Sequence, residues 1–166
     1  NNAAGLPLPN VRIKIHNPNE EGIGEIIAKG PNIMLGYYEN EELTRESIVD
    51  GWFHTGDLGY IDEDGFLYIT GRKKNVIVTK NGKNIYPEEI EALLNRSPYI
   101  AECVIYGREG EDEGDIEVAA EIYPDMEKII EALGTENPTE EQVYRLIEEE
   151  VHKVNKMLVL YKYVRH

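Results

Sequence analysis

GWFHTGDLGYIDEDGFLYITGRKKN, residues 51–75, sets the architecture of the first half of this 166-residue chain. Asp62-Glu-Asp-Gly65 is a tight-turn sequence between two short apolar runs, Gly59–Ile61 and Phe66–Ile69. Gly65 adopts a positive φ at little steric cost, as such turns require. The stretch therefore predicts an antiparallel β-hairpin.

Upstream of the hairpin, Val11–Ile15 alternates apolar and polar residues with the period of a β-strand, and Ile23–Ala28 does so more loosely. Downstream, Asn75–Thr79 and Lys83–Tyr86 are predicted strands, and the turn sequence Asn81-Gly82 separates them. The chain is thus mostly β structure up to the end of the hairpin.

The remaining sequence mixes helices with strands. Pro87 followed by two glutamates favours the start of a helix, and Thr139 with Gln142 matches a capping box at the start of another. Further strands are predicted at residues 102–107, 117–123 and 158–164, and the loop between the first two is acidic (109–115). The pattern predicts an α+β fold: a β-rich subdomain over residues 1–70, then an α+β domain over residues 71–166.

Composition limits the functional classes. The chain is 41% hydrophobic with a formal net charge of −15, which favours a globular domain and argues against a nucleic-acid-binding surface. No apolar run approaches the roughly 20 residues of a membrane span. Cys103 is the single cysteine, so an internal disulfide is excluded and core packing is its expected role. We expect a cytoplasmic location, and we expect the chain to be part of a larger protein.

One segment opposes the acidic character of the rest. Between Gly71 and Tyr86 the sequence has five cationic residues and no acidic one: Arg72, Lys73, Lys74, Lys80 and Lys83. Such a cluster attracts an anionic ligand, although a solvated loop is an equally good interpretation of the charges alone.

Gly56-Asp57 and Arg72 have the chemistry of a nucleotide site. A carboxylate accepts two hydrogen bonds at once and suits the adjacent hydroxyls of a ribose, and a guanidinium donates to ribose or phosphate oxygens. Considered by spacing alone, the simpler interpretation is favoured: Asp57 is a turn residue and Arg72 a partner in a surface ion pair.

Several motifs in a fixed order resemble the adenylate-forming superfamily of acyl-CoA synthetases, adenylation domains and luciferases. They are Gly24-Glu-Ile26, Gly36-Tyr37, Gly51-Trp-Phe-His-Thr-Gly-Asp57, Asp64-Gly65, Gly71-Arg72 and Gly82-Lys-Asn-Ile-Tyr-Pro-Glu-Glu-Ile-Glu91. Members of that superfamily join a carboxylate to ATP, giving an acyl-adenylate and pyrophosphate. In the ligase branch the thiol of coenzyme A then attacks the adenylate.

The resemblance implies roles for particular residues. Asp57 would bind the ribose hydroxyls with help from Arg72. Lys74 would be the hinge about which a mobile C-terminal lid rotates between the two half-reactions, although many relatives have Asp at that position. Gly82 would lie beside the channel for the pantetheine thiol. By their charge, Lys80 and Lys83 would attract the phosphates of coenzyme A, although a solvated turn explains these two lysines equally well. ATP, Mg²⁺ and coenzyme A are the implied cofactors.

The resemblance assigns no catalytic residue and no metal ligand to this chain. The family's catalytic lysine is expected beyond His166, and the phosphate loop before Asn1. We therefore expect the chain to be inactive by itself. His54 has no identifiable partner in the sequence, so packing or surface exposure is its expected role.

The segment from Gly82 to Glu91 is similar to long-chain fatty acyl-CoA ligases, which predicts a fatty acid as substrate. An aryl or medium-chain acid remains an alternative, because no acyl pocket is recognisable here; peripheral membrane contact of the larger protein is also left open. The competing class is a non-catalytic binding module with the same fold. Retention of Asp57, Arg72 and Gly82 together argues against that class.

Overall fold

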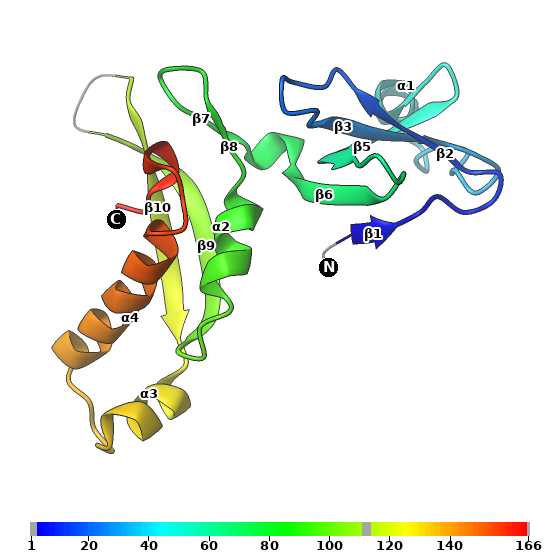
Figure 1. Cartoon of the computed structure of the whole chain (residues 1–166). Coiled ribbons are helices and arrows are strands. Elements are labelled where there is room, and N and C mark those ends of the chain that lie inside the picture. Colours follow the sequence, from blue (N-terminus) through cyan, green and yellow to red (C-terminus); the bar gives the residue numbers. More distant parts are fainter. Residues whose placement is uncertain (1–2, 111–113, 166) are drawn as a thin grey trace. The chain divides into compact units, whose positions relative to one another are not determined.

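The computed structural model describes residues 3–110 and 114–165 (Figure 1). The chain has a mixed α+β fold and divides into two compact units, unit 1 (Asn1–Lys74) and unit 2 (Asn75–His166). The two units are built differently, because unit 1 is largely β-sheet whereas unit 2 combines short strands with helices.

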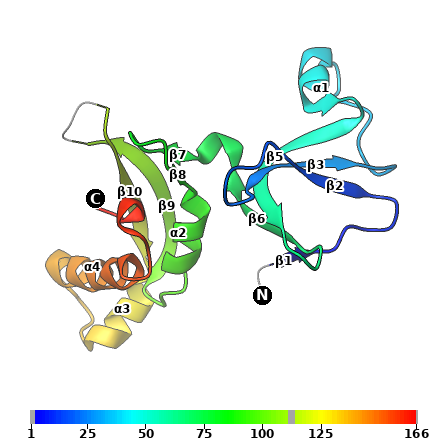
Figure 2. The same cartoon turned by 45° about the horizontal axis from the view of Figure 1, so that its top comes forward.

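Unit 1 contains one antiparallel sheet with the strand order β1-β6-β5-β3-β2, and β4 pairs with β5 (Figure 2). The residues of β2 are alternately exposed and half-buried, which confirms the alternation of polar and apolar residues predicted there from the sequence. The elements are β1 (Ala3–Gly5), β2 (Arg12–His16), β3 (Gly24–Lys29), α1 (Glu41–Ser47), β4 (Ile48–Val49), β5 (Trp52–Ile61) and β6 (Leu67–Arg72).

The predicted hairpin is confirmed. The Gly65 N–H donates to the Asp62 carbonyl at 3.0 Å, and the Asp62 N–H donates to the Phe66 carbonyl at 3.0 Å. Gly65 has a φ of 85°. Strand β5 begins at Trp52, well before the turn, so the Gly56-Asp57 pair lies on a strand and not in a loop.

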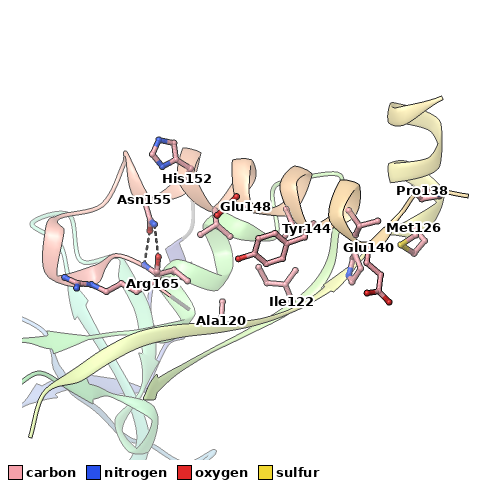
Figure 3. Close-up of a pocket in the computed structure, with 15 residues that line it drawn as sticks. Ala120, Ile122, Met126, Pro138, Glu140, Tyr144, Glu148, His152, Asn155 and Arg165 are labelled. Carbon is pink, nitrogen blue, oxygen red and sulfur yellow. Dashed lines mark hydrogen bonds between the residues drawn. The ribbon is translucent and has the colours of Figure 1, made fainter. Parts of the chain in front are cut away.

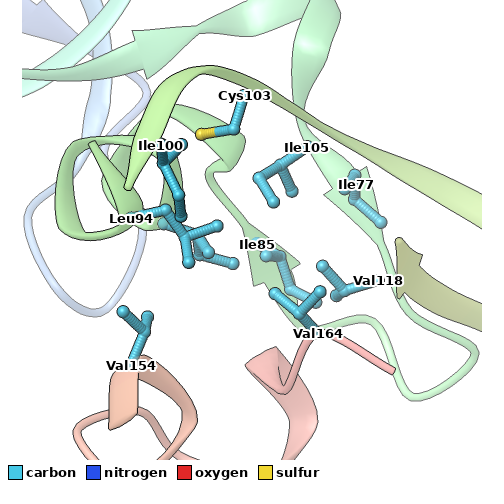
Figure 4. Close-up of a cluster of buried hydrophobic side chains, with 10 residues drawn as sticks. Ile77, Ile85, Leu94, Ile100, Cys103, Ile105, Val118, Val154 and Val164 are labelled. Atoms are coloured by element: carbon cyan, nitrogen blue, oxygen red, sulfur yellow. The ribbon is translucent and has the colours of Figure 1, made fainter. Parts of the chain in front are cut away.

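In unit 2, β9 and β10 form a long antiparallel pair, and β7 and β8 form a short one. Helices α2 and α4 both contribute to the hydrophobic core on one face of the β9–β10 pair (Figure 4). The elements are β7 (Ile77–Val78), β8 (Asn84–Ile85), α2 (Pro87–Leu94), β9 (Ile100–Glu109), β10 (Ile116–Pro124), α3 (Met126–Leu133) and α4 (Glu140–Asn155), with 3₁₀ turns at Lys73–Asn75 and Leu160–Lys162.

That core follows from the register of the two strands. Cys103 faces Ile122 and Ile105 faces Ala120, so these side chains share one face. Ile90 and Leu94 of α2 are completely buried against them. Cys103 is buried, as the sequence predicted.

One backbone N–H on the outer edge of β9 is hydrogen-bonded by a side chain from α2. The Glu91 carboxylate accepts a hydrogen bond from the Ile105 N–H at 2.9 Å. Because β9 pairs with β10 on its other side, Glu91 takes the position that a further strand would occupy.

Two expectations about elements are corrected. The run 158–164 is not a strand: Leu160–Lys162 is a 3₁₀ turn, and Val164 alone bridges to Val118. The strand expected over Asn75–Thr79 is limited to Ile77–Val78. Helices α1 and α3 were not predicted. Part of the acidic loop, 111–113, lies outside the described residues.

Candidate functional site

The β5–β6 pairing places Asp57 directly opposite Arg72. The Arg72 Nε lies 2.9 Å from the Asp57 Oδ1, and an Nη1 hydrogen bond at 3.4 Å reaches the Thr55 carbonyl. The Asp57 and Arg72 side chains are 30% and 54% exposed, so both are accessible to a ligand. The structure therefore brings the two predicted nucleotide-site residues together, as an ion pair.

The backbone before Asp57 is fixed by Thr55. The Thr55 hydroxyl donates to the Ile26 carbonyl at 2.7 Å and accepts a hydrogen bond from the Asp57 N–H at 3.0 Å. Gly56 between them has a φ of 73°, a conformation that side-chain-bearing residues rarely adopt. The Gly in the motif is thus required by the strand geometry at this point.

A second charged group lies in the same unit. The Glu25 carboxylate on β3 contacts His54 Nδ1 at 3.2 Å and Lys73 Nζ at 3.1 Å. From the sequence, Lys73 is only one member of the cationic cluster, Glu25 has no role of its own, and His54 has no identifiable partner. Glu25 and Lys73 are far apart in sequence, so only strand pairing reveals the contact; the sole sequence signal was Glu25 within the Gly24-Glu-Ile26 motif.

The remaining predicted residues lie at the junction of the units and in the β7–β8 turn. Lys74 is exposed within the 3₁₀ turn Lys73–Asn75. Gly82 and Lys83 are exposed in the turn between β7 and β8, where the Gly82 N–H donates to the Thr79 carbonyl at 2.8 Å. The structure thus places Gly82 and Lys83 in unit 2, and Asp57 and Arg72 in unit 1.

Gly82 has a local reason to be glycine. Its φ is 72°, and a Cβ added there would meet no described atom within 4 Å. Backbone conformation, not crowding within the turn, is what disfavours a side chain at this position.

Unit 2 also contains a cavity of about 660 Å³ between β10 and α4 (Figure 3). Ala120 and Ile122 form the strand side, and Tyr144 and His152 lie on the helix side. The lining is mainly apolar, and it includes none of the predicted site residues.

Among the described residues, no group of three or more His, Cys, Asp or Glu side chains is arranged to hold a metal ion. No helix in the described part of the chain is long and apolar enough to span a membrane. The chemistry that the described site offers is recognition of hydroxyl groups by the Asp57 carboxylate and of anions by the Arg72 guanidinium.

Comparisons with known proteins extend this picture. No protein-family profile matches the chain. The 2-succinylbenzoate–CoA ligase of Bacillus cytotoxicus is 43% identical over 121 residues, which are 70% of this chain and 25% of that enzyme. The chain therefore spans about a quarter of the length of this curated relative.

Solved structures agree in fold over nearly the whole chain. The o-succinylbenzoate CoA synthetase of Bacillus subtilis, in complex with its acyl-adenylate intermediate, has a TM-score of 0.76 at 32% identity, over 97% of this chain and 30% of that one. The same enzyme has been solved with ATP and magnesium ion. An amide bond synthetase from Marinactinospora thermotolerans has a TM-score of 0.73 at 26% identity, over 99% and 31% of the two chains.

The chain is therefore similar to one part of adenylate-forming ligases, as the order of its motifs predicted. They do not favour the long-chain fatty acid that the sequence analysis expected. The curated relative and the Bacillus subtilis enzyme are named for 2-succinylbenzoate (o-succinylbenzoate) and not for a fatty acid.

Proposed function

We propose that this chain is part of an ATP-dependent acid–thiol ligase that converts a carboxylic acid to an acyl-adenylate and then to a coenzyme A thioester. The observation that carries the proposal is the likeness, over 97% of the chain, to an enzyme solved with an acyl-adenylate. An aromatic carboxylic acid is the proposed substrate class, in place of a long-chain fatty acid.

In this proposal Asp57 and Arg72 bind the ribose of ATP. The Arg72 guanidinium already holds one oxygen of the Asp57 carboxylate, so the pair presents a fixed acceptor and a fixed set of donors to the nucleotide. Mg²⁺ would accompany the triphosphate, and this chain supplies no ligand set of its own for it among the described residues.

The second half-reaction is assigned to unit 2. Lys74, the last residue of unit 1, would be the hinge of a lid formed by unit 2, and Gly82 and Lys83 would lie along the path of coenzyme A. A hinged lid allows one cleft to hold the triphosphate in the first step and the thiol in the second. The proposed location of the enzyme is the cytoplasm.

The test uses the full-length protein that contains this chain and measures pyrophosphate release and thioester formation. The acid panel contains 2-succinylbenzoate, medium-chain acids and long-chain fatty acids. We expect thioester with an aromatic acid, and loss of both products in Asp57→Ala. Asp64→Ala, which removes an exposed carboxylate from the β5–β6 turn, is the matched control.

Gly82 needs a variant that respects its backbone. Asn tolerates positive φ better than other side chains, so Gly82→Asn adds bulk with little strain. We expect this variant to release pyrophosphate normally and to form little thioester. Absence of both products from wild type with every acid would leave the non-catalytic binding module as the better explanation.

A further inference from the structure

Glu25 is the only buried charged residue in the described part of the chain, with 7% of its surface exposed. A buried carboxylate is costly unless it is paired and hydrogen-bonded. Glu25 meets that requirement with two partners, His54 Nδ1 at 3.2 Å and Lys73 Nζ at 3.1 Å, which share its Oε2. These three residues form what we call the Glu25 cluster.

The cluster is charged at neutral pH. Burial by itself raises the pKa of Glu25. The hydrogen bonds from His54 and Lys73, together with the charges of these side chains, lower the pKa by more than burial raises it. The net result is a pKa below the ordinary value of 4.5. Glu25 is therefore an anion at neutral pH, and it attracts the Lys73 ammonium group.

The partners come from three places in unit 1. Glu25 is on β3, His54 is on β5, and Lys73 immediately follows β6. The Lys73 side chain is 64% exposed whereas that of Glu25 is 9% exposed. The buried, sheet-held carboxylate is thus the fixed member of the pair, and the exposed lysine is the member whose position it determines.

Lys73 lies beside the residue that faces Asp57. Strand β6 ends at Arg72, and the pair Arg72–Asp57 is the last one between β6 and β5. Strand ends fray when nothing holds the following residue. The contact between Lys73 and Glu25 supplies such a hold one residue past the end of β6.

We propose that Glu25 is a positioning residue of the nucleotide site: through Lys73 it holds the end of β6, so that Arg72 stays aligned with Asp57 for ribose binding. This inference rests on the function proposed above and adds residues to it. Neither Glu25 nor Lys73 touches the nucleotide in this scheme. Lys73 transmits the effect, and His54 helps to orient the carboxylate by contacting the same oxygen.

The first test measures adenylation kinetics in the full-length ligase with Glu25→Gln and with Lys73→Met. We expect each variant to raise KM for ATP about threefold to tenfold, while kcat and KM for the carboxylic acid change by less than about twofold. A general folding defect would lower kcat through loss of active enzyme and leave KM for ATP unchanged. Lys14→Met, which removes another exposed lysine amine of the same sheet, is the control.

The double variant decides whether the two residues act together. Glu25→Gln with Lys73→Met is expected to raise KM for ATP no more than either single variant does, because both remove the same contact. Multiplying effects, or unchanged KM for ATP in Lys73→Met, would overturn the proposal. Lys73→Met keeps the buried Glu25–His54 contact, so it remains informative if Glu25→Gln does not fold.

Amide hydrogen exchange in the 166-residue chain separates this proposal from the function on which it rests. We expect Lys73→Met to increase exchange at residues 71–73 by about fivefold or more, without changing exchange in β3. Faster exchange together with no adenylation by wild type would refute the proposed function alone. Normal exchange at residues 71–73 would refute the role of Lys73 in either case.

Discussion

Individual charges in this chain are controlled by what surrounds them. Glu25 and Cys103 are both buried, and burial raises the pKa of each, yet the net shifts are opposite. The hydrogen bonds and charges of His54 and Lys73 lower the pKa of Glu25 below its ordinary value, whereas no cation is recorded beside Cys103 among the described residues. Burial, and secondarily the nearby Glu91 charge, raise the pKa of Cys103 to about 11. The neutral thiol contacts the Glu91 carbonyl and the Asn95 side chain.

Glu25→Gln is expected to destabilise the fold in a pH-dependent way. Because the pKa of Glu25 is lower in the folded chain than in the unfolded one, its stabilisation is complete above the ordinary value of 4.5 and is lost as pH falls through the folded pKa. We expect a loss of about 1–3 kcal/mol at neutral pH. Urea unfolding of both proteins over a pH series should show the difference shrinking below 4.5; a constant difference would mean that charge is not involved.

Cys103 is expected to be unreactive in the folded chain. A buried thiol with a pKa of about 11 has little thiolate at neutral pH, and the thiolate is the nucleophile. Ellman's reagent should label it at least about 100 times more slowly than it labels the guanidinium-unfolded chain. As Cys103 is the single cysteine, the signal needs no correction. Equal rates would show that the region around β9 opens readily.

Secondary structure was predictable where local chemistry specifies it. The turn residues Asp62 and Gly65 specified the hairpin, Pro87 specified the start of α2, and the capping box specified the start of α4; all three are confirmed. The run 158–164 looks like a strand but follows no neighbouring strand along its length. Instead the Asn155 side-chain amide donates to the Val164 carbonyl and accepts a hydrogen bond from the Val164 N–H. No local sequence pattern reveals this contact.

The candidate site was predictable to a similar extent. Asp57 and Arg72 stand on two strands joined by a recognisable turn, so the sequence places them near one another. Glu25 reaches Lys73 only because β3 pairs with β5. Long-range pairing of this kind depends on the register of the whole sheet, which a single sequence does not determine.

Thr139→Ala is expected to weaken the start of α4. The Thr139 hydroxyl accepts a hydrogen bond from the Gln142 N–H at 3.3 Å, and the Gln142 side chain accepts one from the Thr139 N–H at 2.9 Å. Loss of such a cap costs about 1 kcal/mol. Thermal unfolding followed by circular dichroism measures it, with Thr135→Ala, which lies outside the cap, as control. An equal effect of both variants would contradict the role of the cap.

The whole chain has two separately assembled sets of buried residues. Ile26, Leu58 and Leu67 are buried in unit 1, whereas the extended core that includes Ile90 belongs to unit 2. Each unit therefore buries apolar surface against its own elements. Cooperative unfolding is expected within each unit and not across the chain.

Two core truncations test this organisation. Ile90→Ala removes a completely buried side chain from unit 2 and should cost about 2–5 kcal/mol there; Leu67→Ala should do the same in unit 1. Hydrogen exchange followed by mass spectrometry should show faster exchange in residues 75–165 for the first variant, and in residues 3–74 for the second. Acceleration throughout the chain in either variant would show that the units unfold as one.

The placement of Glu91 along β9 has a consequence for solubility. An uncovered strand edge is a template on which other chains add strands, and repeated addition leads to aggregation. The Glu91 carboxylate occupies the Ile105 N–H and brings a negative charge to that edge. Strand addition at Ile105 requires another chain to displace the Glu91 side chain, so this contact opposes self-association through that part of the β9 edge.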